Sequence, residues 1–109
     1  MKRRNLTALR VAIDAARTRR ERALAFYSLA LFHDNNSRER QAIPNYQSAL
    51  RLGLSGQVRA QAYAWLASSF FKTGQRHSAL RALKAARLAA REGSLRKFLD
   101  GLERRITRV

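Results

Sequence analysis

The chain contains an internal repeat with an offset of 37 residues, and this repeat constrains the fold more than any other feature of the sequence. Spacings of i, i+3, i+4 and i+7, followed by i, i+4 and i+7, place side chains on one face of each of two consecutive helices. Each copy therefore predicts a pair of packed helices. The first copy reads Phe26-x-x-Leu29-Ala30-x-x-His33 and Ala42-x-x-x-Tyr46-x-x-Ala49. The second reads Tyr63-x-x-Leu66-Ala67-x-x-Phe70 and Ala79-x-x-x-Leu83-x-x-Ala86.

This pattern resembles the tetratricopeptide repeat, which has a period of about 34 residues and a signature of a large aromatic, Leu-Gly, Tyr, then Ala and Phe. In the first copy, His33 stands at the position of an aromatic residue and Ser37 at that of the turn glycine. The resemblance implies an all-α, right-handed solenoid of helical hairpins with about six antiparallel helices. The second copy carries the match at Tyr63, Leu66, Ala67, Phe70, Gly74, Ala79, Leu83 and Ala86.

Residues 42–62 are also similar to a bacterial group of short, standalone tetratricopeptide proteins. That resemblance implies a module that binds a protein partner and is not an enzyme. The matching segments are Ala42-Ile43-Pro44-x-Tyr46, Ala49-Leu50-x-Leu52-Gly53-Leu54 and Arg59-Ala60-x-Ala62.

Composition limits the class of protein. A chain of 109 residues with 46% apolar residues can fold as one domain with a buried core. It has no cysteine, which excludes disulfides and thiolate chemistry and suits a reducing cytoplasm, the expected location. No run of 18 apolar residues occurs, so no membrane span is expected.

Local signals set the predicted boundaries of the first two helices. Asn5 or Thr7 is expected to cap the first helix. Thr18-x-x-Glu21 is a capping-box pattern, so the second helix should begin after Thr18 and run over about residues 19–33. Ser37 is expected to cap the third helix, where Pro44 requires either a start near Gln41 or a kink. The remaining helices are expected at about residues 57–73, 76–91 and from 94 onward, the last with an apolar stripe of Leu95, Phe98, Leu99, Leu102 and Ile106.

These boundaries predict one tetratricopeptide-like domain over residues 1–109. Its expected parts are an N-terminal half-repeat helix at 1–17, a first repeat at 18–56, a second repeat at 57–93 and a C-terminal capping helix at 94–109.

The resemblance also implies a concave groove lined by the first helix of each pair, which would bind a peptide or helix of a partner. The lysine and asparagine clamp of chaperone-binding relatives has no counterpart, because Tyr27, Leu31, Ala64 and Ser68 stand at the corresponding places. The groove is therefore expected to be mostly apolar. The carried-over residues are Leu24, Tyr27 and Leu31 in the first copy and Gln61, Ala64, Ser68 and Phe71 in the second.

Two interpretations of these apolar residues remain open at this stage. They can contact a partner, or they can pack against a neighbouring helix or a second copy of the protein. Trp65 lies on the opposite side of its helix from Tyr63 and Leu66, so it is either a partner contact or a partly buried ring on the adjacent helix.

The net charge of +16, from 23 basic and 7 acidic side chains, favours acidic partners. Arg76, Lys84, Arg87 and Arg91 fall within about 80° on one predicted helix and form a basic surface. Together with the clusters at residues 2–4 and 17–22, this surface could bind the phosphates of RNA or DNA. No aromatic residues alternate with the arginines to stack bases, and an arginine-rich composition also follows from a GC-rich genome.

Nothing in the sequence predicts catalysis. His33 and His77 belong to different copies, no nucleophile or third group completes a triad, and no metal-ligand spacing or glycine-rich phosphate loop occurs. We expect no catalytic residue, metal or cofactor. The sequence predicts a non-enzymatic protein interaction module, with nucleic-acid binding and self-association as the alternatives.

Overall fold

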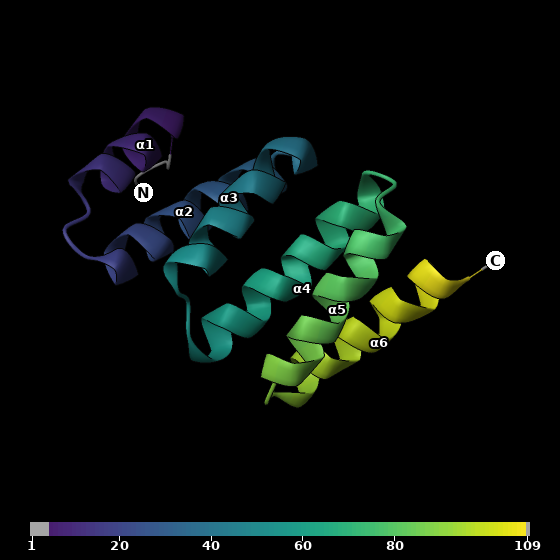
Figure 1. The fold of residues 1–109 in the computed structure, drawn as a ribbon. Coiled ribbons are helices and arrows are strands. Elements are labelled where there is room, and N and C mark those ends of the chain that lie inside the picture. Colours follow the sequence, from purple (N-terminus) through teal and green to yellow (C-terminus); the bar gives the residue numbers. More distant parts are fainter. Residues whose placement is uncertain (1–4, 109) are drawn as a thin grey trace. The chain divides into compact units, whose positions relative to one another are not determined.

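The computed structural model describes residues 5–108, and all regular structure within them is α-helical (Figure 1). This confirms the all-α class predicted from the repeat. The described residues divide into two compact units, one ending at Leu54 and the other beginning at Ser55. In this part of the chain the helices are α1 (Leu6–Ala15), α2 (Arg19–Asn35), α3 (Glu39–Leu52), α4 (Gly56–Lys72), α5 (Arg76–Ala89) and α6 (Gly93–Thr107).

Each unit is built around one helix pair. In the first unit α2 packs along α3, and α1 lies against α2 (Figure 1). In the second unit α4 packs along α5, and α6 contacts both of them (Figure 1). The pairs α2–α3 and α4–α5 are the two copies of the repeat.

Alanines explain how closely the paired helices approach. The repeat places alanine at the same three positions in both copies, and none of these six side chains is exposed to solvent. A methyl group at the contact lets two helix backbones approach closely, whereas a larger side chain would hold them apart. The six residues are Ala30, Ala42 and Ala49 in the first copy and Ala67, Ala79 and Ala86 in the second.

The first two helices begin where the sequence places their caps. The Asn5 side chain accepts a hydrogen bond from the amide of Ala8 at 2.8 Å. Thr18 Oγ1 accepts one from the amide of Glu21 at 3.0 Å, and Glu21 Oε2 accepts one from the amide of Arg17 at 2.8 Å. The Thr18 hydroxyl thus satisfies one of the amides that the start of α2 leaves free, and the Glu21 carboxylate accepts from the amide of the residue just before the cap.

The third helix begins differently from the prediction, which named Ser37 as its cap. That prediction is wrong, because α3 starts at Glu39 after Arg38, which makes no side-chain cap hydrogen bond. A start near Gln41 is also wrong, since α3 already begins at Glu39 and contains Pro44 in its second turn. Pro44 is exposed, so the carbonyl left without a donor one turn earlier can bind water.

Ser37 instead forms the left-handed turn that ends α2. Its φ is +57°, and its amide donates to the carbonyl of Asp34 at 3.0 Å while the amide of Arg38 donates to that of His33 at 2.8 Å. The second copy has the same two bonds around Gly74, whose φ is +79°. Both turns are Schellman motifs, which favour glycine at the left-handed position.

We expect Ser37→Gly to raise the free energy of unfolding by about 1 kcal/mol, because glycine adopts this conformation without a Cβ clash. The reciprocal change, Gly74→Ser, should lower it by about the same amount. Open space surrounds a Cβ built at Gly74, so any loss comes from the backbone and not from crowding. Urea unfolding followed by circular dichroism measures both values, and a stabilising Gly74→Ser would contradict the argument.

Candidate functional site

A pocket with an apolar floor and a basic rim lies where α4 ends in the second unit. Phe71 from the last turn of α4 is partly exposed, and Ile106 from the last turn of α6 is almost fully buried. The pocket has a volume of about 430 Å³, and we call it the Phe71 pocket. Its lining residues are Phe71, Gly74, Arg76, Arg105, Ile106 and Arg108.

Every charged residue that lines the Phe71 pocket is an arginine. Arg76, Arg105 and Arg108 are all exposed, and no carboxylate among the described residues forms an ion pair with any of them. Three guanidinium groups beside an apolar floor are suited to a ligand that carries carboxylates next to an apolar side chain.

The repeat alone does not require this pocket. In the first copy the positions of Phe71, Gly74 and Arg76 are held by Asp34, Ser37 and Glu39. Asp34 Oδ2 there accepts a hydrogen bond from the Tyr46 hydroxyl at 2.8 Å. The first unit therefore carries carboxylates at the positions of Phe71 and Arg76, and one of them, Asp34, is held by an internal hydrogen bond.

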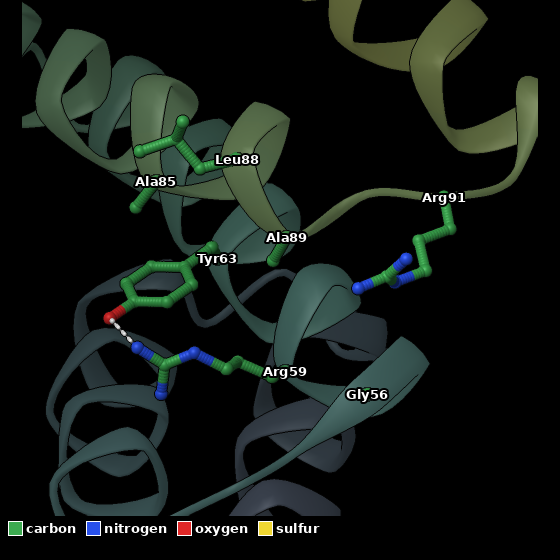
Figure 2. Close-up of a pocket in the computed structure, with 7 residues that line it drawn as sticks. All are labelled: Gly56, Arg59, Tyr63, Ala85, Leu88, Ala89 and Arg91. Atoms are coloured by element: carbon green, nitrogen blue, oxygen red, sulfur yellow. Dashed lines mark hydrogen bonds between the residues drawn. The ribbon is translucent and has the colours of Figure 1, made fainter.

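A second pocket of about 320 Å³ lies in the same unit, at the other end of the helix pair (Figure 2). Arg59 extends over the ring of Tyr63, with its guanidinium carbon 5.1 Å from the ring centroid, and its Nη2 donates to the Tyr63 hydroxyl at 3.3 Å. We call it the Tyr63 pocket. It is lined by Gly56, Arg59, Tyr63, Ala85, Leu88, Ala89 and Arg91.

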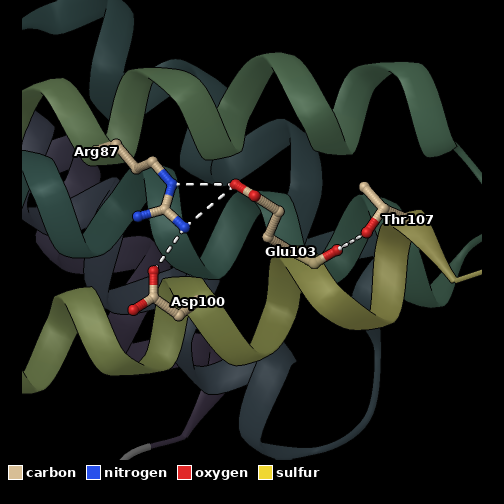
Figure 3. A network of polar contacts seen from close by, with 4 residues as sticks. All are labelled: Arg87, Asp100, Glu103 and Thr107. Carbon is tan, nitrogen blue, oxygen red and sulfur yellow. Dashed lines mark hydrogen bonds and ion pairs between the residues drawn. The ribbon is translucent and has the colours of Figure 1, made fainter.

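The predicted basic surface is only partly available. Arg87 lies between two carboxylates of α6, and its Nη2 is 2.8 Å from Asp100 Oδ1 and 3.1 Å from Glu103 Oε1 (Figure 3). The hydrogen bond to Asp100 is the main reason that the pKa of Arg87 rises above its ordinary value. Its charge is therefore balanced within the fold, and Arg87 belongs to the α5–α6 contact.

The placement of Arg91 on the same helix is wrong. Helix α5 ends at Ala89, so Arg91 lies in the link to α6 and lines the Tyr63 pocket. Arg76 and Lys84 remain on α5 as exposed cations. The basic cluster at residues 2–4 lies outside the described residues.

The predicted groove residues differ in how much surface they present. In the first unit Leu24 is 38% exposed and lines a notch between α1 and α2, Leu31 is partly exposed, and Tyr27 is buried with its ring centroid 6.1 Å from that of Tyr46. In the second unit Ala64 is fully buried. Gln61, Ser68 and Phe71 are partly exposed.

Trp65 matches the second of its two interpretations. Its ring is partly buried and meets Phe98 of α6 edge to face, with centroids 5.0 Å apart and an interplanar angle of 77°. This ring pair helps to fix α6 against α4, since edge-to-face aromatic contacts contribute beyond their buried area.

Sequence reasoning missed three residues of the Phe71 pocket: Arg105, Ile106 and Arg108. Arg105 and Ile106 lie in the last turn of α6, and Arg108 is the residue just after it. The sequence of this amphipathic segment predicted a capping helix but did not indicate where that helix packs. Of the predicted residues, the structure brings Phe71 and Arg76 together, one from the apolar set and one from the basic set.

The burial and the hydrogen bond of His33 indicate that this residue has a structural role. It is 7% exposed, and its Nδ1 accepts a hydrogen bond from Arg38 Nε at 3.1 Å. Burial, followed by the positive charges of Arg38 and Arg10, lowers the pKa of His33 below its ordinary value. The neutral ring is therefore favoured in the folded state, because protonation would remove the acceptor and add a charge beside Arg38.

This pKa shift predicts a pH dependence of stability. In the unfolded chain His33 takes up a proton near pH 6.5, whereas in the folded chain it does so only at lower pH. The contribution of His33 to the free energy of unfolding is therefore fully present above pH 6.5 and decreases below it, by at most about 1.4 kcal/mol per pH unit. His33→Phe should remove this part of the decline between pH 7.5 and 5. His77 is exposed, so His77→Gln should leave the decline intact. Urea midpoints across this pH range measure both slopes, and a His33→Phe slope equal to that of the unmodified protein would contradict the assignment.

Residues 5–108 contain no group of three or more histidine, cysteine, aspartate or glutamate side chains that could hold a metal ion. None of the described helices is long and apolar enough to cross a membrane.

Comparison with known families agrees with the geometry of the helix pairs. The family model described as tetratrico peptide repeat matches residues 23–103, which include both copies of the repeat and most of α6. No curated protein and no solved structure matched the chain. With paired helices, equivalent turns and a family match over most of its length, the chain belongs to the tetratricopeptide repeat family.

Proposed function

We propose that the chain is a non-enzymatic interaction module whose Phe71 pocket binds an acidic peptide segment with an apolar anchor. Membership of the tetratricopeptide family implies a protein partner. The observation that carries the finer proposal is that one pocket is lined by both a partly exposed aromatic ring and three arginines. We also infer a cytoplasmic location from the cysteine-free sequence.

The binding mechanism follows from the two parts of this pocket. An apolar side chain of the partner would contact Phe71 and Ile106 and lose its exposed surface. Aspartate or glutamate residues beside that anchor would pair with Arg76, Arg105 and Arg108, and such pairs can be bidentate. The net charge of +16 would speed the encounter with an acidic partner and make it salt-dependent.

The remaining predicted contacts are proposed for each unit separately. Leu24 and Leu31 would contact a partner of the first unit from α2, and Gln61 and Ser68 would contact a partner of the second unit from α4. Tyr27 and Ala64 are buried and Trp65 lies against Phe98, so the proposal does not rest on these three side chains.

The test uses a fluorescein-labelled peptide in which glutamates flank a single phenylalanine. We expect Phe71→Ala to weaken binding by about tenfold or more, because the pocket loses its aromatic floor. Arg105→Gln should weaken it several-fold. The matched control is Arg104→Gln, which removes one charge from an exposed neighbour outside the lining of the pocket. Fluorescence anisotropy measures each affinity.

Nucleic-acid binding is separated from this proposal by a second probe. Any binding of a labelled single-stranded oligonucleotide should be unaffected by Phe71→Ala, since phosphate contacts need only the cations. If the acidic peptide fails to bind while the oligonucleotide binds and loses affinity equally with Arg104→Gln and Arg105→Gln, the peptide proposal is wrong and a diffuse nucleic-acid surface replaces it.

A further inference from the structure

The Tyr63 pocket borders the most exposed large apolar side chain among those described. Leu88 is 82% exposed and stands beside Ala85 and Ala89, so a leucine projects from a flat strip of small residues on α5 (Figure 2). This pocket shares no lining residue with the Phe71 pocket. The proposed function therefore makes no use of it.

The repeat provides an internal control for the exposure of Leu88. The equivalent residue of the first copy is Arg51, which is also exposed, so this position faces solvent in both units. The packing of the helix pair does not need an apolar side chain here. Conversely, the equivalent of exposed Arg91 is Leu54, which is 6% exposed. The second copy thus exchanges an exposed arginine for a leucine and a buried leucine for an arginine.

The charges around Leu88 are positive and only partly satisfied. Arg59 donates from Nη2 to the Tyr63 hydroxyl, which leaves its other guanidinium N–H groups able to bind a ligand. Arg91 is exposed, and its neighbour Glu92 is held by Gln57 through a hydrogen bond of 3.1 Å. Helix α4 begins at Gly56, so the positive end of its dipole adds to the two arginine charges.

We propose that this face of α5 and the Tyr63 pocket form a second docking surface, which binds an acidic amphipathic helix of a protein partner. Ala85 and Ala89 let a helix backbone approach closely, and Leu88 would insert between side chains of that helix. Glutamates on the flank of the bound helix would pair with Arg59 and Arg91. With two separate surfaces of this kind, the second unit could hold two partners at once.

The apolar strip favours a helix over a nucleic acid as the occupant. A phosphodiester backbone would use the arginines but would leave Leu88 in water, with no gain from its burial. An acidic amphipathic helix uses both parts of the surface. A second copy of this chain is disfavoured by charge, because each copy carries +16.

The probe is a labelled, end-blocked helical peptide with leucine and alanine on one face and glutamates flanking that face. Its matched peptide has glutamine in place of glutamate. We expect the glutamate peptide to bind about tenfold more tightly than the glutamine peptide, and Leu88→Ser to weaken its binding by about tenfold. Val11→Ser is the matched control, because Val11 is an exposed aliphatic residue of the first unit at 58% exposure.

A second matched pair of variants controls for the effect of net charge on binding. Arg59→Gln and Arg22→Gln each remove one positive charge, and Arg22 is the repeat equivalent of Arg59. Only Arg59→Gln should weaken binding, by about fivefold. Equal losses in the two variants, or unchanged affinity in Leu88→Ser, would overturn the proposal. Phe71→Ala should leave this affinity unchanged, so a failure here is distinct from a failure of the Phe71 pocket.

Self-association is the remaining outcome of the test. Sedimentation of the unmodified protein and of Leu88→Ser over a range of concentrations measures dimer formation. We expect no dimer that depends on Leu88, that is, none that is present in the unmodified protein and lost in Leu88→Ser. Such a dimer would assign the surface to a second copy and overturn the proposal for a partner helix.

Discussion

Tyr46→Ala should lower the free energy of unfolding of the first unit by about 3–5 kcal/mol, the cost of removing a large side chain from a packed core. Tyr46 has no exposed surface, and its ring packs near Tyr27. Its hydroxyl donates to Asp34 at 2.8 Å, so the substitution removes both an aromatic ring and a charge-assisted hydrogen bond.

Two substitutions divide this loss between the ring and the hydroxyl. Tyr46→Phe keeps the ring and should cost only about 1.5 kcal/mol, because Asp34 is partly exposed and water can replace the lost donor. Tyr46→Leu introduces the residue that the second copy carries at this position, Leu83, and should give an intermediate loss. Urea unfolding by circular dichroism measures the series. A Tyr46→Phe loss as large as that of Tyr46→Ala would show that the hydroxyl and not the ring dominates.

Leu102→Ala should destabilise the second unit by about 2–5 kcal/mol, because it opens a cavity where α6 packs on the helix pair. Leu102 is fully buried, as is Leu99 one turn before it. Arg87→Gln removes the visible ion pairs between α5 and α6 but should cost about 1 kcal/mol or less, since the three side chains are about one third to one half exposed.

Salt concentration separates these two contributions. In 1 M NaCl the effect of Arg87→Gln should largely vanish, because the Debye length falls to about 3 Å. The effect of Leu102→Ala should persist. Unfolding midpoints of both variants at low and high salt test this difference, and an Arg87→Gln loss larger than that of Leu102→Ala would mean that the ion pairs hold α6 in place.

The fold could be predicted because the repeat fixes which residues are buried. Alanines at three equivalent positions in each copy made the helix pairs recognisable, and their burial in the structure explains why the spacing carried that information. The caps at Asn5 and Thr18 were also predictable, since a cap depends only on residues a few positions apart.

Two local predictions failed because residue type was considered without the backbone conformation. Serine is a good helix cap, so Ser37 was placed at the start of α3, whereas its φ of +57° makes it the left-handed residue that ends α2. Its alignment with Gly74 carried the better information. Proline was expected either to delay the start of α3 to about Gln41 or to kink the helix, and the delayed start is wrong because α3 begins at Glu39 and Pro44 lies inside it as an exposed residue.

The candidate site was less predictable because it depends on how α6 packs. Arg105, Ile106 and Arg108 join Phe71 only through the position of that helix, which spacing along the chain does not specify. The same holds for Arg87, whose carboxylate partners lie 13 and 16 residues further along the sequence. Periodicity identified the basic residues but not which of them form ion pairs.

The most direct test of the proposed function is an NMR titration of the ¹⁵N-labelled protein with the glutamate-flanked phenylalanine peptide. We expect the largest amide shifts at Phe71, Gly74, Arg105 and Ile106, and smaller shifts in Phe71→Ala. Shifts spread over exposed arginines throughout the chain, or no shifts near Phe71, would contradict it.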